Sequence, residues 1–509
     1  MPEPTEVKPI RWWPFYTIVA LVVVALVFIW VPEKSSRQTQ QVMPTMGIGI
    51  IGFLLFCVWF FAFSRLKGKV RLQGLGILVG VFVVCVALFR VRGVDGDLIP
   101  KLEWRWSSVT AVSVQGSGKM AMDYPQFLGP ERNAKLHGIV LKADWVQHPP
   151  KLLWRIPVGE AWSAFAVVGG VAVTQEQQGE YETVACYDLF TGTEKWRHKD
   201  QARYQNPMAG IGPRATPTLL DDRVYTLGAT GILNCLDLET GNKIWSRDAV
   251  AEIGAEIQEW GMTSSPLVLE DKVIVSLGGR DHQSLVAYHK DTGANIWSSG
   301  SRPAGNSSPS LWSIAETDQV LIFNDKQVAS HDPVSGKLLW KYPWPGSTQH
   351  VAQPVPIPGD RLFVSTGYGT RCELIQIGKD DHGKFSATRI WQNNRLKAKF
   401  ANVVYKEGYI YGLDDGILVC LDVESGKRQW KRGRYGHGQM ILVDDLLLIQ
   451  TESGDVVLVD ALPGEFKERA RFPALDGHTW NNPTLAAPYL LVRNDKEAAC
   501  YELAIKQVN

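Results

Sequence analysis

One short pattern recurs from residue 150 onward and limits the fold of this 509-residue chain more than any other feature. An Asp is followed three residues later by Thr or Ser, then by Gly, and a Trp stands four residues beyond the Gly. The Asp side chain can bond turn amides, and Gly accepts the positive φ that other residues resist. The pattern therefore predicts a β-hairpin whose second strand presents a Trp to a neighbouring sheet. The clear copies end at Trp196, Trp245, Trp297, Trp340 and Trp430, and the copy at Trp297 has His289 in place of the Asp.

The spacing of the repeat indicates how many strands each unit contains. Successive closing aromatics are 39 to 52 residues apart, and two further β-rich segments precede each copy. This spacing is typical of four-stranded propeller blades, and the turn chemistry excludes helical repeats of the same length. We therefore predict an all-β, eight-bladed β-propeller over residues 150–505. Counting the degenerate copies, the closing aromatics are Trp154, Trp196, Trp245, Trp297, Trp340, Trp391, Trp430 and Phe472.

The two ends of the repeat region complement each other. The segment around Trp154 has no three strands before it, whereas three β-segments without a fourth follow Phe472. Pairing of these last strands with the first one would close the ring and protect its edges. We therefore predict that the propeller is closed by its N- and C-terminal strands.

The seven cysteines do not indicate a metal site or a disulfide framework. No CxxC pair and no adjacent pair occurs among them. Cys186, Cys235, Cys420 and Cys500 occupy equivalent positions in different copies, so the repeat holds them apart. We interpret them as small buried apolar residues and predict no metal ligands.

The first hundred residues contain three apolar runs, at about 15–31, 47–63 and 72–89. Each has the minimum length for an α-helix that crosses a bilayer, so residues 1–92 are predicted to be a membrane domain with three transmembrane helices. A cleaved signal peptide is the alternative for the first run, but two further runs follow closely. Four basic residues lie between the second and third runs, which places this loop in the cytoplasm.

This orientation places everything after the third run on the outer side of a bacterial inner membrane, with the propeller facing the periplasm. Residues 93–149 are predicted to be a linker, because part of it is small, polar and Gly-containing. Within it, the aromatic residues of the stretch 124–130 are expected to dock on the domain that follows. The formal net charge of +1 gives no electrostatic footprint for nucleic acid, so we expect no nucleic-acid partner.

The repeat resembles the pyrroloquinoline quinone (PQQ) type of propeller repeat over about residues 150–505. That family includes quinoprotein alcohol and sugar dehydrogenases, and also the non-enzymatic scaffold lipoprotein of the outer-membrane β-barrel assembly machinery. The helices followed by a propeller are also similar to membrane-bound sugar dehydrogenases that pass electrons to quinone. The resemblance therefore implies the architecture and leaves the chemistry open.

The candidate site lies where the chain enters the innermost strand of each blade, because these connections converge on the mouth of the channel. Arg214, Lys397 and Lys399 have few acidic neighbours there, only Glu160 and Glu259, which favours an anionic ligand or an acidic peptide. For any single candidate, a purely structural role in capping a strand is the alternative. The predicted ligand-binding residues are Trp162, Arg214, Trp260, Asn306, His350, Lys399, Tyr435, His437, Trp480 and Asn481.

Two functions remain for the propeller. The resemblance implies that a dehydrogenase would hold PQQ with Ca²⁺ and use an aspartate base, with Trp162, Trp260 or Trp480 stacking on the cofactor. No Glu, Asn and Asp constellation and no adjacent cysteines support this, and no catalytic residue is assigned. A lipidation Cys after a signal, as in the scaffold lipoprotein, is also missing. We therefore favour a binding or scaffold module for an envelope protein or a small anion, with a PQQ-dependent dehydrogenase as the alternative.

Overall fold

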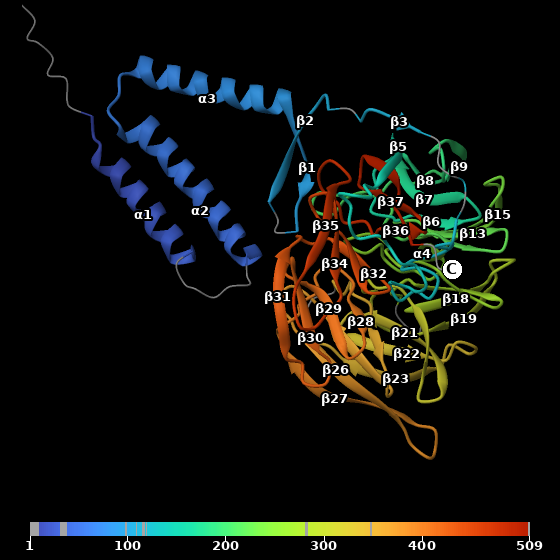
Figure 1. Cartoon of the computed structure of the whole chain (residues 1–509). Helices are drawn as coiled ribbons and strands as arrows, with labels where there is room; N and C mark the ends of the chain where they lie inside the picture. Colours follow the sequence, from blue (N-terminus) through green and yellow to red (C-terminus); the bar gives the residue numbers. More distant parts are fainter. Residues whose placement is uncertain are drawn as a thin grey trace, which may run out of the picture. The chain divides into compact units, whose positions relative to one another are not determined.

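The computed structural model describes residues 10–30, 38–96, 99–107, 109–114, 118, 120–279, 283–346 and 349–506. The chain divides into two compact units, Met1–Ser108 and Val109–Asn509. The first unit is mainly helical, and the regular secondary structure of the second unit is strands apart from one short helix (Figure 1).

The first unit contains the three predicted apolar helices followed by a hairpin. They are α1 (Trp13–Trp30), α2 (Gln38–Val58), which continues as the π-helical turn η1 (Trp59–Phe63), and α3 (Gly68–Leu88). Helices α1 and α2 pack together, and the buried Trp59 contacts the ring of Phe15 at a centroid distance of 5.2 Å. Two stretches, Gln41–Phe63 and Gly68–Leu88, are long and apolar enough to cross a bilayer, whereas the apolar part of α1 is shorter. Three membrane spans therefore stay a prediction.

The strands of the hairpin, β1 (Phe89–Val94) and β2 (Pro100–Trp104), follow α3 directly. The predicted third span ended at Phe89, but this residue is already the first of a strand. The predicted linker also contains β3 (Val112–Ser113) and β4 (Lys135–Leu136), each of which pairs with a strand of the repeat region.

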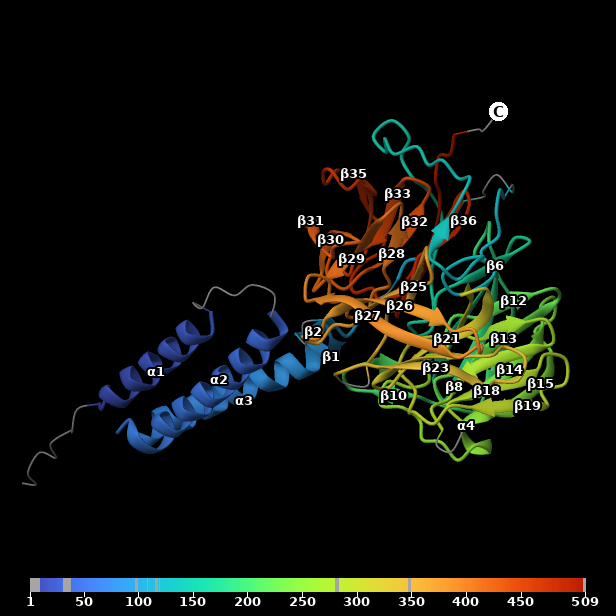
Figure 2. The ribbon, with the colours of Figure 1, turned by 90° about the horizontal axis from the view of Figure 1, so that it is seen from below.

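The second unit is propeller-like. Its described residues form eight sheets of four or five strands, antiparallel except where β4 joins one of them, and the sheets follow one another in chain order (Figure 2). The first strands of neighbouring sheets contact each other, as β6 contacts β12 and β12 contacts β16. The last sheet returns to the first, because β36 contacts β6, and in Figure 1 the red and teal strands lie side by side.

The strands of the first four sheets pair in chain order. They are β6 (Ala166–Val168), β7 (Val171–Gln178), β8 (Tyr181–Asp188) and β9 (Glu194–Asp200); β12 (Thr218–Leu220), β13 (Arg223–Leu227), β14 (Ile232–Asp237) and β15 (Lys243–Asp248); β16 (Leu267–Leu269), β17 (Lys272–Ser276), β18 (Leu285–His289) and β19 (Asn295–Ser299); and β20 (Ser310–Ile314), β21 (Thr317–Asn324), β22 (Gln327–His331) and β23 (Leu338–Pro343). A small hairpin, β10 (Gln205–Asn206) and β11 (Gly210–Ile211), and the short helix α4 (Ala249–Glu252) lie in the connections.

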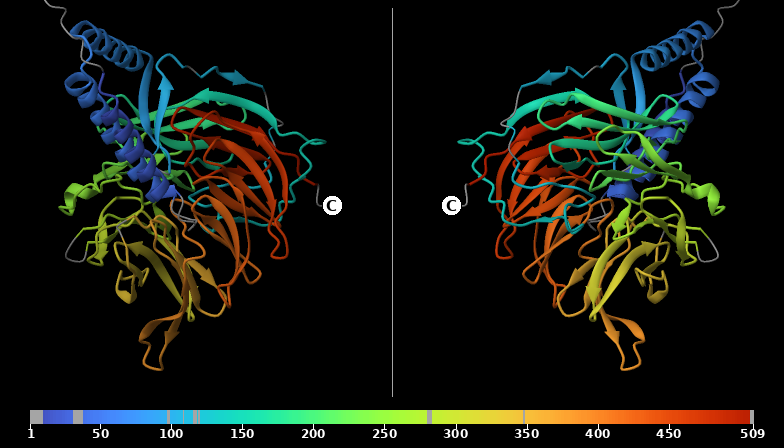
Figure 3. Two further views of the ribbon diagram at one scale, coloured as in Figure 1. Left: turned by 90° about the vertical axis from the view of Figure 1, so that its left-hand side faces the viewer. Right: turned by 90° about the vertical axis from the view of Figure 1, so that its right-hand side faces the viewer.

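Three further sheets continue this order. In the first of these three, the hairpin formed by its last two strands projects beyond the other sheets (orange, bottom of Figure 3). They are β24 (Val355–Ile357), β25 (Arg361–Ser365), β26 (Cys372–Lys379) and β27 (Phe385–Asn393); β28 (Val404–Lys406), β29 (Tyr409–Asp414), β30 (Ile417–Asp422) and β31 (Arg428–Arg434); and β32 (Gln439–Val443), β33 (Leu446–Gln450), β34 (Asp455–Asp460) and β35 (Glu468–Pro473).

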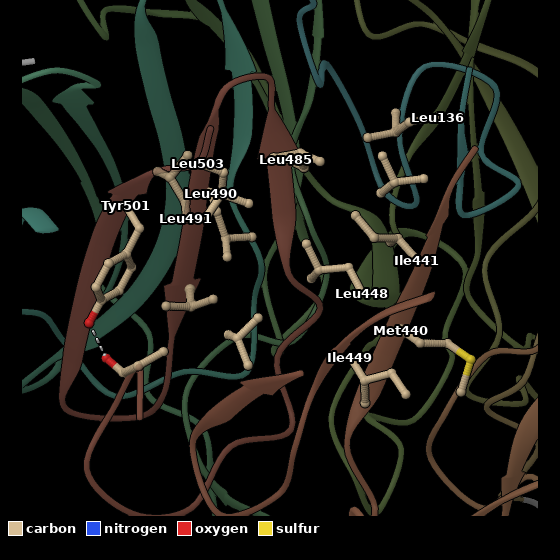
Figure 4. Close-up of a cluster of buried hydrophobic side chains, with 14 of the residues drawn as sticks. Leu136, Met440, Ile441, Leu448, Ile449, Leu485, Leu490, Leu491, Tyr501 and Leu503 are labelled. Atoms are coloured by element: carbon tan, nitrogen blue, oxygen red, sulfur yellow. Dashed lines mark hydrogen bonds between the residues drawn. The ribbon is translucent and has the colours of Figure 1, made fainter. Parts of the chain in front are cut away.

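The eighth sheet joins the two ends of the repeat region, as the sequence indicated. It contains β36 (Thr484–Ala486), β37 (Tyr489–Arg493), β38 (Glu497–Glu502) and β5 (Lys151–Pro157), and Cys500 is paired with Trp154. Strand β3 adds a fifth strand on the outer side of β5. Figure 4 shows the apolar side chains of this sheet, including Leu485 and Leu491, beside those of β32 and β33.

Each sheet in this closed order lies between two other sheets, so both of its faces are covered. This explains the nearly continuous apolar runs of its strands. Strand β33 reads Leu-Leu-Leu-Ile-Gln, and its last four residues are buried. The repeated turn of one sheet packs on the Trp of the preceding sheet. Gly192 has a φ of +72°, and a Cβ atom at this position would lie 2.8 Å from the ring of Trp154. The turn therefore needs Gly both for its backbone and for contact with the indole.

The segment 120–141, which we call the axial segment, crosses the first strands of several sheets. Tyr124 exchanges two backbone hydrogen bonds with Val167, and the Leu219 amide donates to the Pro125 carbonyl. Further along, β4 pairs in parallel with β32. Tyr124 is buried, so its ring docks on the repeat region as expected for the stretch 124–130.

Arg132 of the axial segment is buried between sheets. Its Nη1 atom donates to the Pro266 carbonyl at 2.9 Å, and Nη2 donates to the carbonyls of Ser265 and Pro309, each at 3.0 Å. Burial lowers the pKa of Arg132 to about 9. This side chain therefore ties the axial segment to two sheets through backbone carbonyls.

Candidate functional site

One pocket collects side chains from the connections that precede the first strands of seven sheets, and from Gln439, the first residue of β32 in the remaining sheet. Its volume is about 150 Å³, room for roughly ten water molecules and hence for a small molecule. The pocket is lined by Phe127, Trp162, Ala209, Arg214, Trp260, Thr263, Ser265, Asn306, Ser308, Gln349, Val351, Tyr368, Phe400, Asn402, Gln439, Trp480 and Asn482.

Five of the ten predicted site residues line this pocket. They are Trp162, Arg214, Trp260, Asn306 and Trp480. Each comes from a different sheet connection, so the order of the sheets brings together residues that lie far apart in the chain.

Aromatic rings in tilted contact form one wall of the pocket. The rings of Trp162 and Trp480 are 5.0 Å apart at their centroids, and Phe400 lies 4.9 Å from Trp480. Hydrogen bonds hold both indoles in place, because Trp162 Nε1 donates to the Ala209 carbonyl at 2.7 Å and Trp480 Nε1 donates to Glu452 Oε1 at 3.0 Å. The wall thus presents flat ring faces in fixed orientations, which suits a planar or ring-shaped ligand.

Two predicted residues lie directly behind this wall. The ammonium group of Lys399 lies over the rings of Tyr368 and Phe400, at 5.2 and 5.3 Å from their centroids. The ring of His437 lies 5.4 Å from Phe400, and its backbone amide donates to Glu452 Oε2 at 2.9 Å. Both side chains therefore support pocket residues.

The other three predicted residues are buried in structural contacts. His350 stacks on Phe323 with a centroid distance of 4.4 Å, and burial lowers its pKa to about 4, so its ring stays neutral. Tyr435 donates to Glu468 Oε2 at 2.7 Å, and Asn481 donates to the Ser163 carbonyl at 2.8 Å. These contacts with neighbouring residues are structural roles, the alternative that applied to each single candidate.

The expected surplus of positive charge is smaller than predicted. The Lys397 ammonium forms ion pairs with Asp414 and, at 3.2 Å, with Asp415. The prediction that its acidic neighbours are few, only Glu160 and Glu259, was therefore wrong, because Asp414 on β29 and Asp415 in the turn that follows it pair with Lys397. Arg214 is the charged residue that lines the pocket.

Arg214 is held by the loop around it. Its Nη2 atom donates to the Ala209 carbonyl at 3.0 Å, and its guanidinium group lies 4.7 Å from the ring centroid of Tyr204. Burial lowers the pKa of Arg214 to about 10, so the guanidinium is charged at neutral pH. The pocket thus contains one fixed positive charge.

Amide side chains supply most of the remaining polarity. Asn306, Gln349, Asn402, Gln439 and Asn482 line the pocket. Among the described residues, three polar atoms of the lining are buried without a hydrogen-bond partner: Trp260 Nε1, Gln439 Oε1 and Asn482 Oδ1. Buried polar atoms are normally hydrogen-bonded, so these atoms can bind a ligand that offers both donors and acceptors.

The lining does not fit PQQ with Ca²⁺. Calcium requires several oxygen ligands, usually including carboxylates, and the dehydrogenase reaction requires a carboxylate base. The lining contains no Asp and no Glu. The part of the chain that the structure describes also contains no cluster of three or more His, Cys, Asp or Glu residues suited to a metal ion.

Twelve of the seventeen lining residues were not among the predicted site residues, and two of these twelve lie where the repeat did not direct attention. Phe127 comes from the axial segment, outside the repeat, and Tyr368 comes from a connection inside a sheet. The aromatic stretch 124–130 was a usable signal for Phe127, but nothing in it indicated that the ring would reach a pocket built by the repeats.

Together, the closed order of the sheets and the pocket at their first strands define a propeller-type repeat protein. The family model described as outer membrane protein assembly factor BamB matches residues 149–278 and 180–432, together more than half of the chain. The chain therefore belongs to this family of PQQ-like repeat proteins.

Individual relatives agree with this assignment. The chain is 26% identical over 324 residues to outer membrane protein assembly factor BamB of Shewanella oneidensis, which covers 54% of this chain and 78% of the relative. It is 28% identical over 128 residues to quinohemoprotein alcohol dehydrogenase ADH IIB of Pseudomonas putida, covering 23% of this chain and only 17% of that enzyme. The match to BamB of Burkholderia pseudomallei covers 56% of that relative.

The fold itself is shared with a solved enzyme structure. Quinohemoprotein alcohol dehydrogenase from Comamonas testosteroni superposes with a TM-score of 0.56 at 14% sequence identity, over 77% of this chain and 82% of that one. At this identity the similarity concerns the fold alone.

Proposed function

We propose that this protein is a binding module: an eight-bladed, closed propeller, tethered to the bacterial inner membrane by its apolar helices and facing the periplasm. The eight sheets and the pairing of β5 with β38 support the closed ring. The two membrane-length helical stretches and the basic loop between them support the tether and its orientation.

The observation that carries the proposal is the composition of the pocket. Aromatic rings and amides form its walls, and no lining residue can act as a carboxylate base or calcium ligand. Such a lining binds through ring stacking and hydrogen bonds to hydroxyl or carbonyl groups. Arg214 adds one positive charge, so we infer a ligand with a ring, several hydroxyl groups and one acidic group, such as a sugar acid.

The family also supports a protein partner. Its model and two relatives are described as outer membrane protein assembly factors, so a scaffold role in the cell envelope is part of the proposal. The alternative, a PQQ-dependent dehydrogenase that passes electrons to membrane quinone, is supported by the names of the quinohemoprotein relatives. The pocket lining argues against this alternative.

A matched pair of probes tests the ligand class. Glucuronate and glucose differ only at C6, so their affinities for the full chain in lipid nanodiscs isolate the contribution of the acidic group. We expect glucuronate to bind more tightly, and Arg214→Gln to remove this preference. Arg203→Gln is the control, because Arg203 lies in the same connection but does not line the pocket. Equal binding of the two probes would contradict the anionic part of the proposal.

The same preparation tests the enzyme alternative. PQQ and Ca²⁺ are added, binding is followed by tryptophan fluorescence, and dye reduction is measured with glucose or ethanol. We expect neither stoichiometric binding nor dye reduction. Tight binding of PQQ together with dye reduction would replace the binding module by a dehydrogenase.

A further inference from the structure

The hairpin of the first unit has one wholly apolar face. Phe89 is paired with Trp104, and Val91 with Leu102, and residues directly opposite each other in an antiparallel pair share a face. Arg90 and Glu103, also paired, stand on the other face and form an ion pair at 3.1 Å. The alternation of the two strands thus separates apolar from charged side chains.

The apolar face is exposed in the structure. Val91 and Leu102 have 66% and 67% of their surface exposed, and Trp104 has 44%. A two-stranded hairpin is only marginally stable alone, and an exposed apolar patch usually marks a contact surface. The hairpin therefore needs a covering surface to stabilise it.

The position of the hairpin identifies this surface. Helix α3 ends at Leu88 and β1 begins at the next residue, so no linker separates the hairpin from a helix of membrane length. Arg105 Nε donates to the Val86 carbonyl at 3.0 Å, which ties the far end of β2 to the last turn of α3. If α3 crosses the bilayer, the base of the hairpin lies at the bilayer surface.

The side chains suit that depth. Trp104 and Trp106 contact each other with a centroid distance of 5.3 Å, and Trp is enriched where acyl chains meet headgroups. Residues 89–106 carry four basic residues, Arg90, Arg92, Lys101 and Arg105, against three acidic ones, and this small positive excess favours a surface of anionic headgroups.

We propose that hairpin β1–β2 is an interfacial membrane-binding element, whose face of Phe89, Val91, Leu102 and Trp104 lies in the outer boundary of the bilayer that α3 crosses. The proposal rests on the membrane tether of the proposed function. The hairpin would add a second, peripheral contact with lipid beside the membrane-spanning helices. This contact would restrict the direction in which the chain continues from the bilayer surface.

Neighbouring residues on opposite faces provide the test. The full chain carries Cys57→Ser and Cys85→Ser, and its five other cysteines are buried. Leu102→Cys and Val91→Cys report on the apolar face, Lys101→Cys on the charged face, and Val83→Cys on α3. Each is labelled with a nitrobenzoxadiazole dye in vesicles of phosphatidylethanolamine and phosphatidylglycerol that contain brominated lipid as quencher.

We expect dyes at 91 and 102 to be quenched at least about twofold more than the dye at 101, and the dye at 83 to be quenched fully. Quenching at 83 with equal, weak quenching at 91, 101 and 102 would overturn the hairpin proposal and leave the tether intact. A blue-shifted but unquenched dye at 102 would show that protein covers the face, which also overturns it. No quenching at 83 would refute the tether and the hairpin proposal with it.

Discussion

The indole Nε1 of Trp196 donates a hydrogen bond to the carbonyl oxygen of Leu238 over 2.9 Å, and this bond joins β9 to the turn of the next sheet. The same bond recurs from Trp154 to Leu189, from Trp245 to Lys290 and from Trp391 to Val423. The Trp and the turn of the repeat therefore act across the boundary between sheets, and in these copies the turn of one sheet is bonded to the Trp of the previous sheet.

Gly241 should be irreplaceable for this contact. Its φ is +72°, and an added Cβ would overlap the ring of Trp196. Gly254→Ala is the control, because Gly254 has a φ of +61° and no atom within 4 Å of an added Cβ. We expect Gly241→Ala to lower the free energy of unfolding by about 1–3 kcal/mol more than Gly254→Ala, the usual effect of overpacking. Equal losses in chemical denaturation would show that the ring does not restrict the turn.

The hydrogen bond of the indole can be separated from its packing. Trp297 packs on Gly336 as Trp196 packs on Gly241, but among the described residues its Nε1 has no hydrogen-bond partner. We therefore expect Trp196→Phe to cost about 1 kcal/mol more than Trp297→Phe, the net contribution of one hydrogen bond. Thermal unfolding followed by circular dichroism measures both variants. A larger loss for Trp297→Phe would contradict this assignment.

Arg132 should hold the axial segment in place. Replacing it with Met leaves three backbone carbonyls of neighbouring sheets without their donor, at a cost of about 2–5 kcal/mol. Glu131→Gln serves as the control, because Glu131 is exposed. Limited proteolysis should cleave the Arg132→Met variant within residues 120–141 before any other site. Unchanged stability would mean that the segment is held by its backbone pairing alone.

Glu182 should make stability depend on pH. Burial raises its folded pKa to about 7 from 4.5, although hydrogen bonds from Thr230 oppose the shift. Between these pH values the folded state holds a proton that the unfolded state has released, so stability falls as pH rises from 4.5 to 7. A shift of this size corresponds to about 3 kcal/mol.

The variant Glu182→Gln should lose this pH dependence of the free energy of unfolding, because Gln does not titrate. We expect the difference in melting temperature between Glu182→Gln and the wild type to grow in favour of the variant from pH 5 to pH 8. Glu180→Gln, at an exposed neighbouring position, should follow the wild type across the same range. A constant difference for Glu182→Gln would contradict a raised pKa.

The repeat could be predicted well because its chemistry is local and periodic. The turn, the closing aromatic and the missing fourth strand beside Trp154 are all readable along the chain. The axial segment could not be placed this way, since it follows no period and bends through the positive φ of Leu128, Arg132 and Ala134. The charge of Lys397 was misjudged for a similar reason, because Asp414 comes close to it only when β29 has formed.

The hairpin β1–β2 was missed because its alternation is short and directly continues an apolar helix. Five predicted site residues do not line the pocket, and the reason for this difference between prediction and structure is another one. The repeat specifies which connection they occupy, but the direction of a side chain from a connection depends on neighbours such as Phe323 beside His350.

Strand β3 lies outside β5 in the sheet that joins the beginning and end of the repeat region. Any mechanical pull along the chain from the residues before β3 would therefore reach the repeat region at the sheet that joins its two ends. The short strand Val112–Ser113 would separate from β5 first, and the force would act on the pairing of β5 with β38 only after that.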